Sequence, residues 1–286
     1  MNQECKQVFE ALKWASSFLE DNNREAHAAR LLLQHVLKIE YTQLMLKMQE
    51  PLTDEQQLQF KQLVEQHCAG TPVQYLIGQE EFYGRSFEVT PDVLIPRPET
   101  EELVYTTLNK MPSLFSSKSL KFADIGTGSG AIAISMKKEC PELNVTATDL
   151  SEAALEVARR NAVTNEADIR FLQGDLTKPL SDEKFDIILS NPPYIAYDEA
   201  KDMEDVVLEH EPHSALFADE NGLKLYRELC EQLPSIMNKP GLIGFEIGYQ
   251  QGEAVENLLK THFPNGKVEV LKDLFGQNRM VFCEIK

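Results

Sequence analysis

From residue 120 onward, the sequence alternates between short apolar runs and longer segments with helical periodicity. Runs such as 185–190, rich in β-branched and aromatic residues, predict strands. Strands joined through helices pair in parallel, because each connection returns the chain to the same end of the sheet. The pattern therefore predicts an α/β fold with a seven-stranded, mostly parallel sheet and helices on both faces. We expect strands at 120–125, 143–148, 168–173, 185–190, 241–247, 267–271 and 279–284, the last two as an antiparallel hairpin, and helices at 129–138, 151–163, 222–237 and 250–262.

The first 75 residues have a different pattern, with helical periodicity and no strand signal. Within them, Thr53 and Gln56 form a capping box that begins a helix ending near Gly70. Two alternating runs around Gly84-Arg85 then predict a β-hairpin. The organisation we expect is a helical domain at 1–75, a β-hairpin linker at 76–97 and an α/β domain at 98–286.

The chain is strongly acidic, with 28 Lys and Arg residues against 46 Asp and Glu residues and a formal net charge of −18. Non-specific binding to nucleic acids or anionic membranes requires basic surfaces, so the charge favours a small substrate or a basic protein partner. The five cysteines are scattered without a Cys-x-x-Cys pair, and the six histidines lack metal-ligand spacing. We therefore expect reduced thiols, no metal, no membrane span, no secretory signal and a cytoplasmic protein, with a monomer as the working expectation.

A glycine-rich segment, Asp124-Ile125-Gly126-Thr127-Gly128-Ser129-Gly130, lies where a predicted strand ends and a helix begins. Alternate glycines let the backbone turn tightly and approach a ligand, and the helix start offers free N–H groups. A tight turn without a ligand is the alternative, and the spacing differs from the Gly-x-Gly-x-x-Gly pattern of dinucleotide-binding loops. We predict a ligand-binding loop formed by Asp124, Gly126, Thr127, Gly128, Ser129 and Gly130.

Two acids follow the next two predicted strands. Asp149 lies 19 residues beyond Gly130 and can accept hydrogen bonds from both hydroxyls of a ribose, although it can also cap the following helix. Asp175, in Gly174-Asp175-Leu176, can reach an adenine amino group, although it can also be an ordinary loop acid. Both lie at the carboxyl edge of the predicted sheet, beside the glycine loop.

The tetrad Asn191-Pro192-Pro193-Tyr194 directly follows the apolar strand at 185–190. The two prolines stiffen the backbone and supply no N–H group, so the loop offers acceptors: the Asn191 side chain and the Pro192 carbonyl. Two acceptors can hold both hydrogens of a planar –NH₂ group, and the Tyr194 ring can stack on that group. A rigid turn that ends a strand is the alternative. We expect Asn191, Pro192 and Tyr194 to be catalytic, with Pro193 beside them in the substrate site.

The glycine loop, Asp149 and the tetrad together resemble class I S-adenosylmethionine-dependent methyltransferases, and the whole chain resembles the HemK/PrmC family. The further motifs that carry this resemblance are Pro72-Val73-Gln74-Tyr75-Leu76-Ile77-Gly78, Glu81-Phe82-Tyr83-Gly84, Pro96-Arg97-Pro98-Glu99-Thr100-Glu101, Glu211-Pro212 with Ala215-Leu216-Phe217, and Glu246-Ile247-Gly248 with Gln251-Gly252. The resemblance implies a Rossmann-like methyltransferase sheet. It also implies S-adenosyl-L-methionine as cofactor and S-adenosyl-L-homocysteine as product.

The implied reaction is methylation of the glutamine in the Gly-Gly-Gln motif of class I peptide release factors. The resemblance also makes Arg97 and Glu101 candidate substrate-binding residues, and it adds Leu176 and Asn191 to the cofactor site. Leu176 departs from the family, which often has an aromatic residue there, so an apolar contact remains without ring stacking. No general base is expected, because the amide nitrogen becomes more acidic as it attacks.

Three alternatives remain open at this point: an adenine amino methyltransferase of nucleic acid, a glutamine methyltransferase of a ribosomal protein, and a non-catalytic cofactor-binding module that docks a partner. The first needs a basic surface, but residues 1–90 hold 8 basic and 13 acidic residues, a net charge of −5. We therefore expect no direct nucleic-acid contact. We interpret the helical domain as a docking site for the protein substrate.

Overall fold

The computed structural model describes residues 6–117, 119–203 and 205–286. The chain divides into two compact units. One contains the first 78 residues together with a short later helix, and the other contains Gln79–Met203 and Glu211–Lys286. The β-hairpin expected as a linker thus lies within the second unit.

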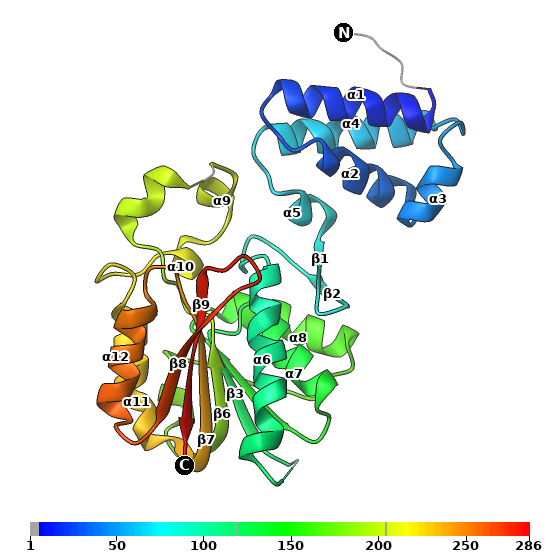
Figure 1. Cartoon of the computed structure of the whole chain (residues 1–286). Coiled ribbons are helices and arrows are strands. Elements are labelled where there is room, and N and C mark those ends of the chain that lie inside the picture. The colour runs from blue at the N-terminus through cyan, green and yellow to red at the C-terminus, as the bar shows by residue number, and fades with distance from the viewer. Residues whose placement is uncertain (1–5, 118, 204) are drawn as a thin grey trace. The chain divides into compact units, whose positions relative to one another are not determined.

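The first unit is helical. It consists of α1 (Val8–Asp21), α2 (His27–Leu37), α3 (Tyr41–Leu46), α4 (Asp54–Cys68), α5 (Val73–Ile77) and α9 (Asp205–His210) (Figure 1). The predicted capping box is present: the Thr53 hydroxyl accepts from the Gln56 N–H, and the Gln56 side chain accepts from the Thr53 N–H. The core packs alanines of α1 and α2 against Leu19, Leu33 and Phe60. Helix α9 was not predicted, because its six residues come from a charged segment far along the chain.

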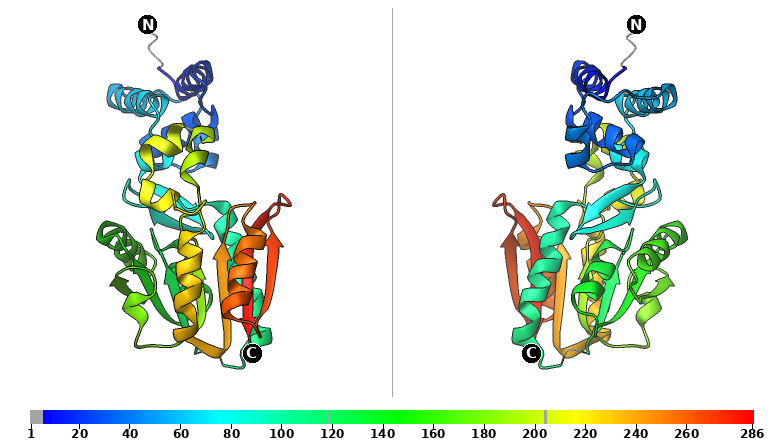
Figure 2. Two further views of the ribbon diagram at one scale, coloured as in Figure 1. Left: turned by 90° about the vertical axis from the view of Figure 1, so that its left-hand side faces the viewer. Right: turned by 90° about the vertical axis from the view of Figure 1, so that its right-hand side faces the viewer.

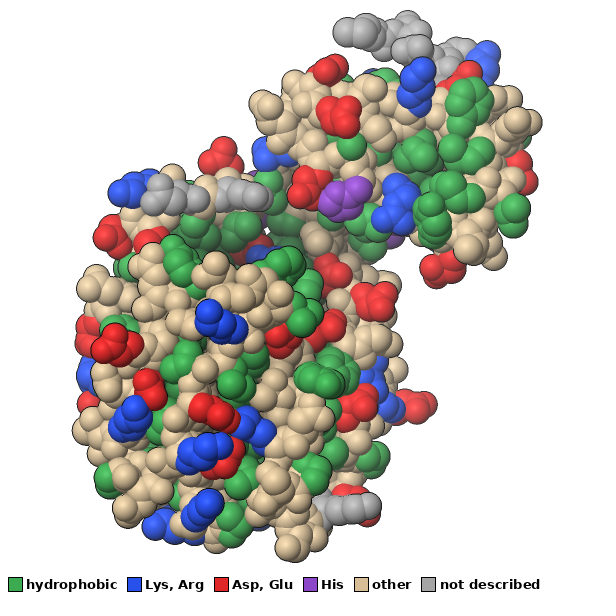
Figure 3. Space-filling view, viewed as in Figure 1, with side chains coloured by type: hydrophobic (Ala, Val, Ile, Leu, Met, Phe, Trp, Pro, Cys, Tyr) green, Lys and Arg blue, Asp and Glu red, His purple; other side chains and the backbone are tan. Residues whose placement is uncertain are grey.

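Several large apolar side chains remain on the surface of this unit. Figure 3 shows hydrophobic side chains gathered on the face around α3. The most exposed of them is Leu46, at 87%. The exposed set is Phe9, Tyr41, Met45, Leu46 and Leu58.

The second unit is built on a seven-stranded sheet with the order β5-β4-β3-β6-β7-β9-β8. Neighbouring strands pair in parallel from β5 to β7, and β9 pairs antiparallel with both β7 and β8. This confirms the predicted α/β fold. The strands are β3 (Lys121–Ile125), β4 (Asn144–Asp149), β5 (Arg170–Gln173), β6 (Phe185–Ser190), β7 (Met237–Glu246), β8 (Lys267–Lys272) and β9 (Asn278–Ile285), and a separate hairpin is formed by β1 (Gln79–Phe82) and β2 (Arg85–Glu88).

Helices cover both faces of the sheet (Figure 2). Apolar side chains of α6 (Pro98–Leu114) and α7 (Ala131–Glu139) share one core with the hairpin, and α8 (Glu152–Thr164) lies on the same side. Helices α11 (Lys224–Gln232) and α12 (Gly252–His262) pack on the other face. The remaining short elements are α10 (His213–Leu216), η1 (Lys178–Leu180), η2 (Tyr197–Asp202) and η3 (Leu233–Ser235).

The helix expected at 222–237 ends earlier than predicted. Helix α11 stops at Gln232, a 3-10 turn containing Pro234 follows, and Met237 already begins β7. Proline cannot continue an α-helical hydrogen-bond ladder, and Met237 pairs instead with Phe185 of β6. The apolar periodicity ran across this boundary, because the turn and the strand start are buried in the same core.

Candidate active site

The strand order reverses beside β3, because the chain continues to β4 and β5 on one side and returns to β6 and β7 on the other. Ligands of open α/β sheets bind outside the carboxyl ends of the strands at such a switch point. A cavity of about 280 Å³ lies there. Its walls include most residues of the 92–97 segment, the β3–α7 loop, the ends of β4 and β6, the Gly174–Leu176 turn and residues of α10.

The glycine loop forms one wall of this cavity. Gly126 and Gly128 have φ of +72° and +55°, and a Cβ at either would meet no atom within 4 Å, so both backbones face open space. Gly130 serves a different purpose: its φ is +84°, and a Cβ there would lie 3.0 Å from Ile134 Cδ1 and 3.2 Å from Ala158 Cβ. The first two glycines leave room for a ligand, and the third lets α8 approach α7.

Asp124 lies beneath the loop rather than in the cavity lining. It is fully buried, and its Oδ2 accepts from Thr127 Oγ1 at 2.6 Å and from the Ala133 N–H at 3.2 Å. Burial raises the pKa of this carboxyl to about 7. Asp124 therefore shapes the loop from below, whereas Thr127 and Ser129 line the cavity.

Asp149 lines the cavity at the end of β4. Its Oδ2 accepts from the Gly128 N–H and its Oδ1 from the Ser151 N–H, both at 2.9 Å. Burial raises the pKa of Asp149, and these backbone donors partly oppose the increase. The Leu150 N–H also acts on this carboxylate, and the lone-pair positions that remain can accept from ligand hydroxyl groups.

Asp175 and Leu176 also line the cavity. The Asp175 carboxylate is partly exposed and pairs with Lys178 Nζ at 2.5 Å. Leu176 has a φ of +50°, and its carbonyl accepts from Thr148 Oγ1 at 3.2 Å. A Cβ at Gly174 would lie 2.2 Å from Pro179 Cγ, so only glycine fits this turn.

Asn191, Pro192 and Pro193 line the opposite wall, directly after β6. Asn191 Nδ2 donates to Thr100 Oγ1 at 3.2 Å, and this hydroxyl donates to Glu246 Oε2 at 2.6 Å. With its amino group engaged in this way, Asn191 retains its side-chain oxygen as an acceptor.

Tyr194 turns away from the lining residues. Its carbonyl accepts from Gln251 Nε2 at 2.9 Å, and its ring packs against the core of the α11–α12 face. Burial raises the pKa of its hydroxyl to about 12. The structure thus brings together three members of the tetrad at the cavity and places the fourth side chain behind them.

Arg97 lines the cavity, whereas Glu101 does not. Arg97 Nη2 lies 2.5 Å from Oε1 of the buried Glu211, whose Oε2 accepts from the Ile95 N–H. Glu101 instead accepts from the Tyr83 N–H of the hairpin turn at 2.7 Å.

The sequence analysis did not single out Thr100, Glu211, Glu246 or Asn161 as individual site residues, although three of them lie in the motifs quoted above. Asn161 is 1% exposed, and its amide bridges the glycine loop and the end of the β-hairpin. For Asn161, the available sequence signal was a polar residue at a position where the helical pattern predicts an apolar one.

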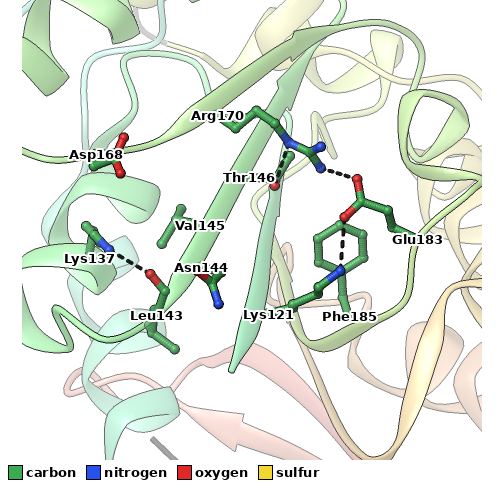
Figure 4. Close-up of a pocket in the computed structure, with 10 residues that line it drawn as sticks. All are labelled: Lys121, Lys137, Leu143, Asn144, Val145, Thr146, Asp168, Arg170, Glu183 and Phe185. Atoms are coloured by element: carbon green, nitrogen blue, oxygen red, sulfur yellow. Dashed lines mark hydrogen bonds and ion pairs between the residues drawn. The ribbon is translucent and has the colours of Figure 1, made fainter. Parts of the chain in front are cut away.

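A second cavity, of about 350 Å³, lies at the opposite edge of the sheet, where β3, β4 and β6 begin (Figure 4). Most of its charged groups bind one another or the backbone, whereas no hydrogen bond or ion pair joins the Asp168 carboxylate to the other residues drawn in Figure 4. Lys121 and Arg170 both pair with Glu183, and Lys137 Nζ donates to the Leu143 carbonyl at 2.7 Å. This leaves the carboxyl-edge cavity as the candidate active site.

No described helix is both long enough and apolar enough to cross a membrane. Within the described ranges, no group of three or more His, Cys, Asp or Glu residues could hold a metal ion.

Comparisons with known proteins agree with this geometry. Residues 10–78 match the family model "PrmC N-terminal domain", and residues 102–212 match "Methyltransferase small domain". The chain is 47% identical to a release factor glutamine methyltransferase of Bacillus anthracis over 98% of this chain and 99% of that protein. It is also 47% identical to one of Bacillus subtilis, over 96% of this chain and 97% of that protein. A methyltransferase structure from Pyrococcus furiosus shares the fold, with a TM-score of 0.54 and 22% identity over 71% of this chain and 90% of that chain.

Proposed function

The chain belongs to the family of release factor glutamine methyltransferases, enzymes that use S-adenosylmethionine, and on this basis we propose the specific reaction. It transfers a methyl group to the side-chain amide nitrogen of the glutamine in the Gly-Gly-Gln motif of class I peptide release factors. The enzyme acts in the cytoplasm, where these factors work. It acts as a monomer, and size-exclusion chromatography with light scattering tests this oligomeric state.

The residues around the cavity fit S-adenosylmethionine. Gly126 and Gly128 leave open space for a closely approaching ligand, and Asp149 retains acceptor capacity for the ribose hydroxyls. Asp175 and Leu176 lie on the same wall, where they would flank the adenine. When bound, the cofactor supplies a methyl group already activated on a sulfonium sulfur, so the protein has to supply positioning rather than an activating base.

The observation that carries the proposal is the orientation of Asn191. Its Nδ2 is committed to Thr100, which leaves the oxygen to accept from the substrate amide. The Pro192 carbonyl is the second acceptor, and Pro193 and Arg97 complete this wall. Hydrogen bonds to both N–H groups favour positive charge developing on the amide nitrogen during attack. We assign Tyr194 the role of anchoring the loop, since its carbonyl is held by Gln251.

The reaction is tested by incubating the full chain with S-adenosylmethionine labelled in its methyl group. The acceptors are a class I release factor, the same factor with Gln→Asn in the motif, a ribosomal-protein mixture and adenine-containing DNA and RNA. We expect label on the Gly-Gly-Gln peptide alone, located by mass spectrometry. Label on nucleic acid, or equal label on the Gln→Asn factor, would refute the proposal.

We propose that the helical unit docks the release factor. Its surface carries exposed apolar side chains on α3, and the N-terminal region is acidic, which suits a basic partner. Leu46→Ser should raise the KM for the whole factor but not for a short Gly-Gly-Gln peptide, because it removes the exposed apolar side chain without changing the charge. Association should also slow with salt. Val163→Ser, on an exposed position of α8 in the second unit, is the matched control. An unchanged KM in the Leu46 variant would contradict a docking role for this face.

A further inference from the structure

A chain of hydrogen bonds leads from the active-site cavity into the core of the second unit. It begins at Asn191, passes through the Thr100 hydroxyl in the first turn of α6 and ends at Glu246, the last residue of β7. Both side chains are buried, Thr100 at 5% and Glu246 at 2% exposure. Burying a carboxyl lowers the stability of a fold unless it is compensated. The link of the Glu246 carboxyl to the cavity through the Thr100 hydroxyl therefore calls for an explanation.

The direction of these bonds follows from the number of hydrogens available. The Thr100 hydroxyl has one hydrogen, and a carboxylate can only accept, so the hydrogen is directed to Glu246. Thr100 Oγ1 then offers Asn191 only lone pairs. It therefore binds the amino end of the Asn191 amide and disfavours the flipped amide, which would direct its oxygen at the hydroxyl oxygen.

We propose that Thr100 and Glu246 are positioning residues that fix the orientation of the Asn191 amide, so that its oxygen faces the substrate amide. This inference rests on the proposed function, which gives that oxygen its hydrogen-bond partner. In the flipped state, an –NH₂ group would face the –NH₂ group of the substrate. Neither can accept from the other, so the flipped state cannot hold the glutamine.

The surroundings of Glu246 make this orientation dependent on pH. Burial raises the pKa of Glu246 to about 7. The protonated acid can donate to Thr100, which frees the hydroxyl hydrogen to bind the Asn191 oxygen and so permits the flip. Turnover should therefore rise with pH as Glu246 ionises. The charged and titratable groups that act on Glu246 or are affected by it are Arg279 on β9, Arg97 and Glu99 at the start of α6, Tyr194 after β6 and Tyr226 on α11.

The decisive variants are Thr100→Val, which removes the hydroxyl at nearly constant shape, and Thr100→Ser, which restores it. Thr107→Val is the matched control: Thr107 lies on the same helix, is fully buried, and its hydroxyl donates to the Leu103 carbonyl within α6. We expect Thr100→Val to lower kcat by about 10- to 100-fold, because the Asn191 amide loses the hydrogen bond that fixes its orientation. The dissociation constant for S-adenosylmethionine should stay unchanged, Thr100→Ser should recover most of the turnover, and Thr107→Val should keep the normal kcat.

Equal turnover in Thr100→Val and the wild type would overturn the inference, as would a Thr100→Ser variant no better than Thr100→Val. Asn191→Ala, assayed in parallel, separates the two levels of argument. If it is inactive while Thr100→Val is normal, only the positioning role fails; if it is fully active, the amide-holding role fails as well.

Glu246→Gln provides an independent measurement if Thr100→Val does not fold. Its neutral amide cannot titrate, so the rise of kcat with pH near the Glu246 pKa should disappear. Cofactor affinity, measured at each pH, shows whether another carboxyl causes the rise. A wild-type pH profile of kcat in Glu246→Gln would overturn the proposal.

Discussion

Replacing Asn161, the amide residue of α8, should strongly destabilise the second unit. Its Oδ1 accepts from the Glu88 N–H at 2.6 Å, and its Nδ2 donates to the Glu88 carbonyl at 3.0 Å and the Ser129 carbonyl at 2.9 Å. One buried side chain therefore connects α8, the end of the β-hairpin and the glycine loop. Asn161→Ala removes all three bonds at once.

The magnitude follows from the groups left behind. A buried backbone group without a partner costs about 1–3 kcal/mol, and three groups are affected. Water entering the space left by the side chain recovers part of this cost, so we expect a loss of about 3–5 kcal/mol in the free energy of unfolding. Asn161→Asp should be at least as harmful at neutral pH, because one carboxylate oxygen would face two carbonyl oxygens.

The assay can separate the two units, because the chain's one tryptophan, Trp14, lies in the helical unit. In urea unfolding, tryptophan fluorescence reports that unit, whereas far-ultraviolet circular dichroism reports both. Asn161→Ala should shift the circular dichroism transition and leave the fluorescence transition in place. Asn165→Ala, at the half-buried C-cap residue directly after α8, is the control and should cost about 1 kcal/mol or less. A loss in Asn161→Ala no larger than in this control would refute the reasoning.

Two further predictions concern the cavity, and a third concerns the packing of the glycine loop. Asp149→Asn should weaken S-adenosylmethionine binding in calorimetry by about 10- to 150-fold, since each charge-assisted hydrogen bond contributes about 1.5–3 kcal/mol. Because burial raises the Asp149 pKa, the affinity of the wild type for S-adenosylmethionine should fall as pH drops through that pKa. Asp149→Asn should not show this fall, and the same fall in Asp149→Asn would point to another group. Asn191→Ala should lower kcat by about 10²-fold with little change in cofactor affinity, and normal single-turnover rates would contradict its amide-holding role. Gly130→Ala should lower the free energy of unfolding by about 2–3 kcal/mol, because its φ is +84° and the new Cβ would press on Ile134 and Ala158; an unshifted urea midpoint would count against this.

The sequence predicted the sheet, because each strand and helix carries its own local periodicity. It also placed Gly128, Asp149 and Asn191 at one cavity without knowledge of their contacts. That inference was possible because each residue follows a parallel strand, and the carboxyl ends of parallel strands meet at one edge of the sheet.

Contacts between distant segments could not be predicted in this way. The bonds from Asn161 to Glu88 and from Arg97 to Glu211 span 73 and 114 residues, and no local pattern encodes which segments meet. The direction of the Tyr194 side chain is equally non-local, since the core around α11 and α12 holds its ring. Local spacing identifies residues at a strand end, but tertiary packing determines which of their side chains enter the cavity.

The two walls of the cavity rest on the same device, a buried carboxyl that accepts from a threonine hydroxyl. Asp124 accepts from the Thr127 hydroxyl of the glycine loop, and Glu246 accepts from the Thr100 hydroxyl that contacts Asn191. Burial raises both pKa values to about 7, so between about pH 4 and 7 the folded chain binds more protons at these groups than the unfolded chain. Their contribution to stability therefore falls as pH rises through this range and stays lost above it. A neutral amide would avoid that loss, but it carries donors as well as an acceptor and could not fix the direction of a hydroxyl. The carboxyls thus give up stability at neutral pH to hold both walls of the site in one hydrogen-bonded arrangement.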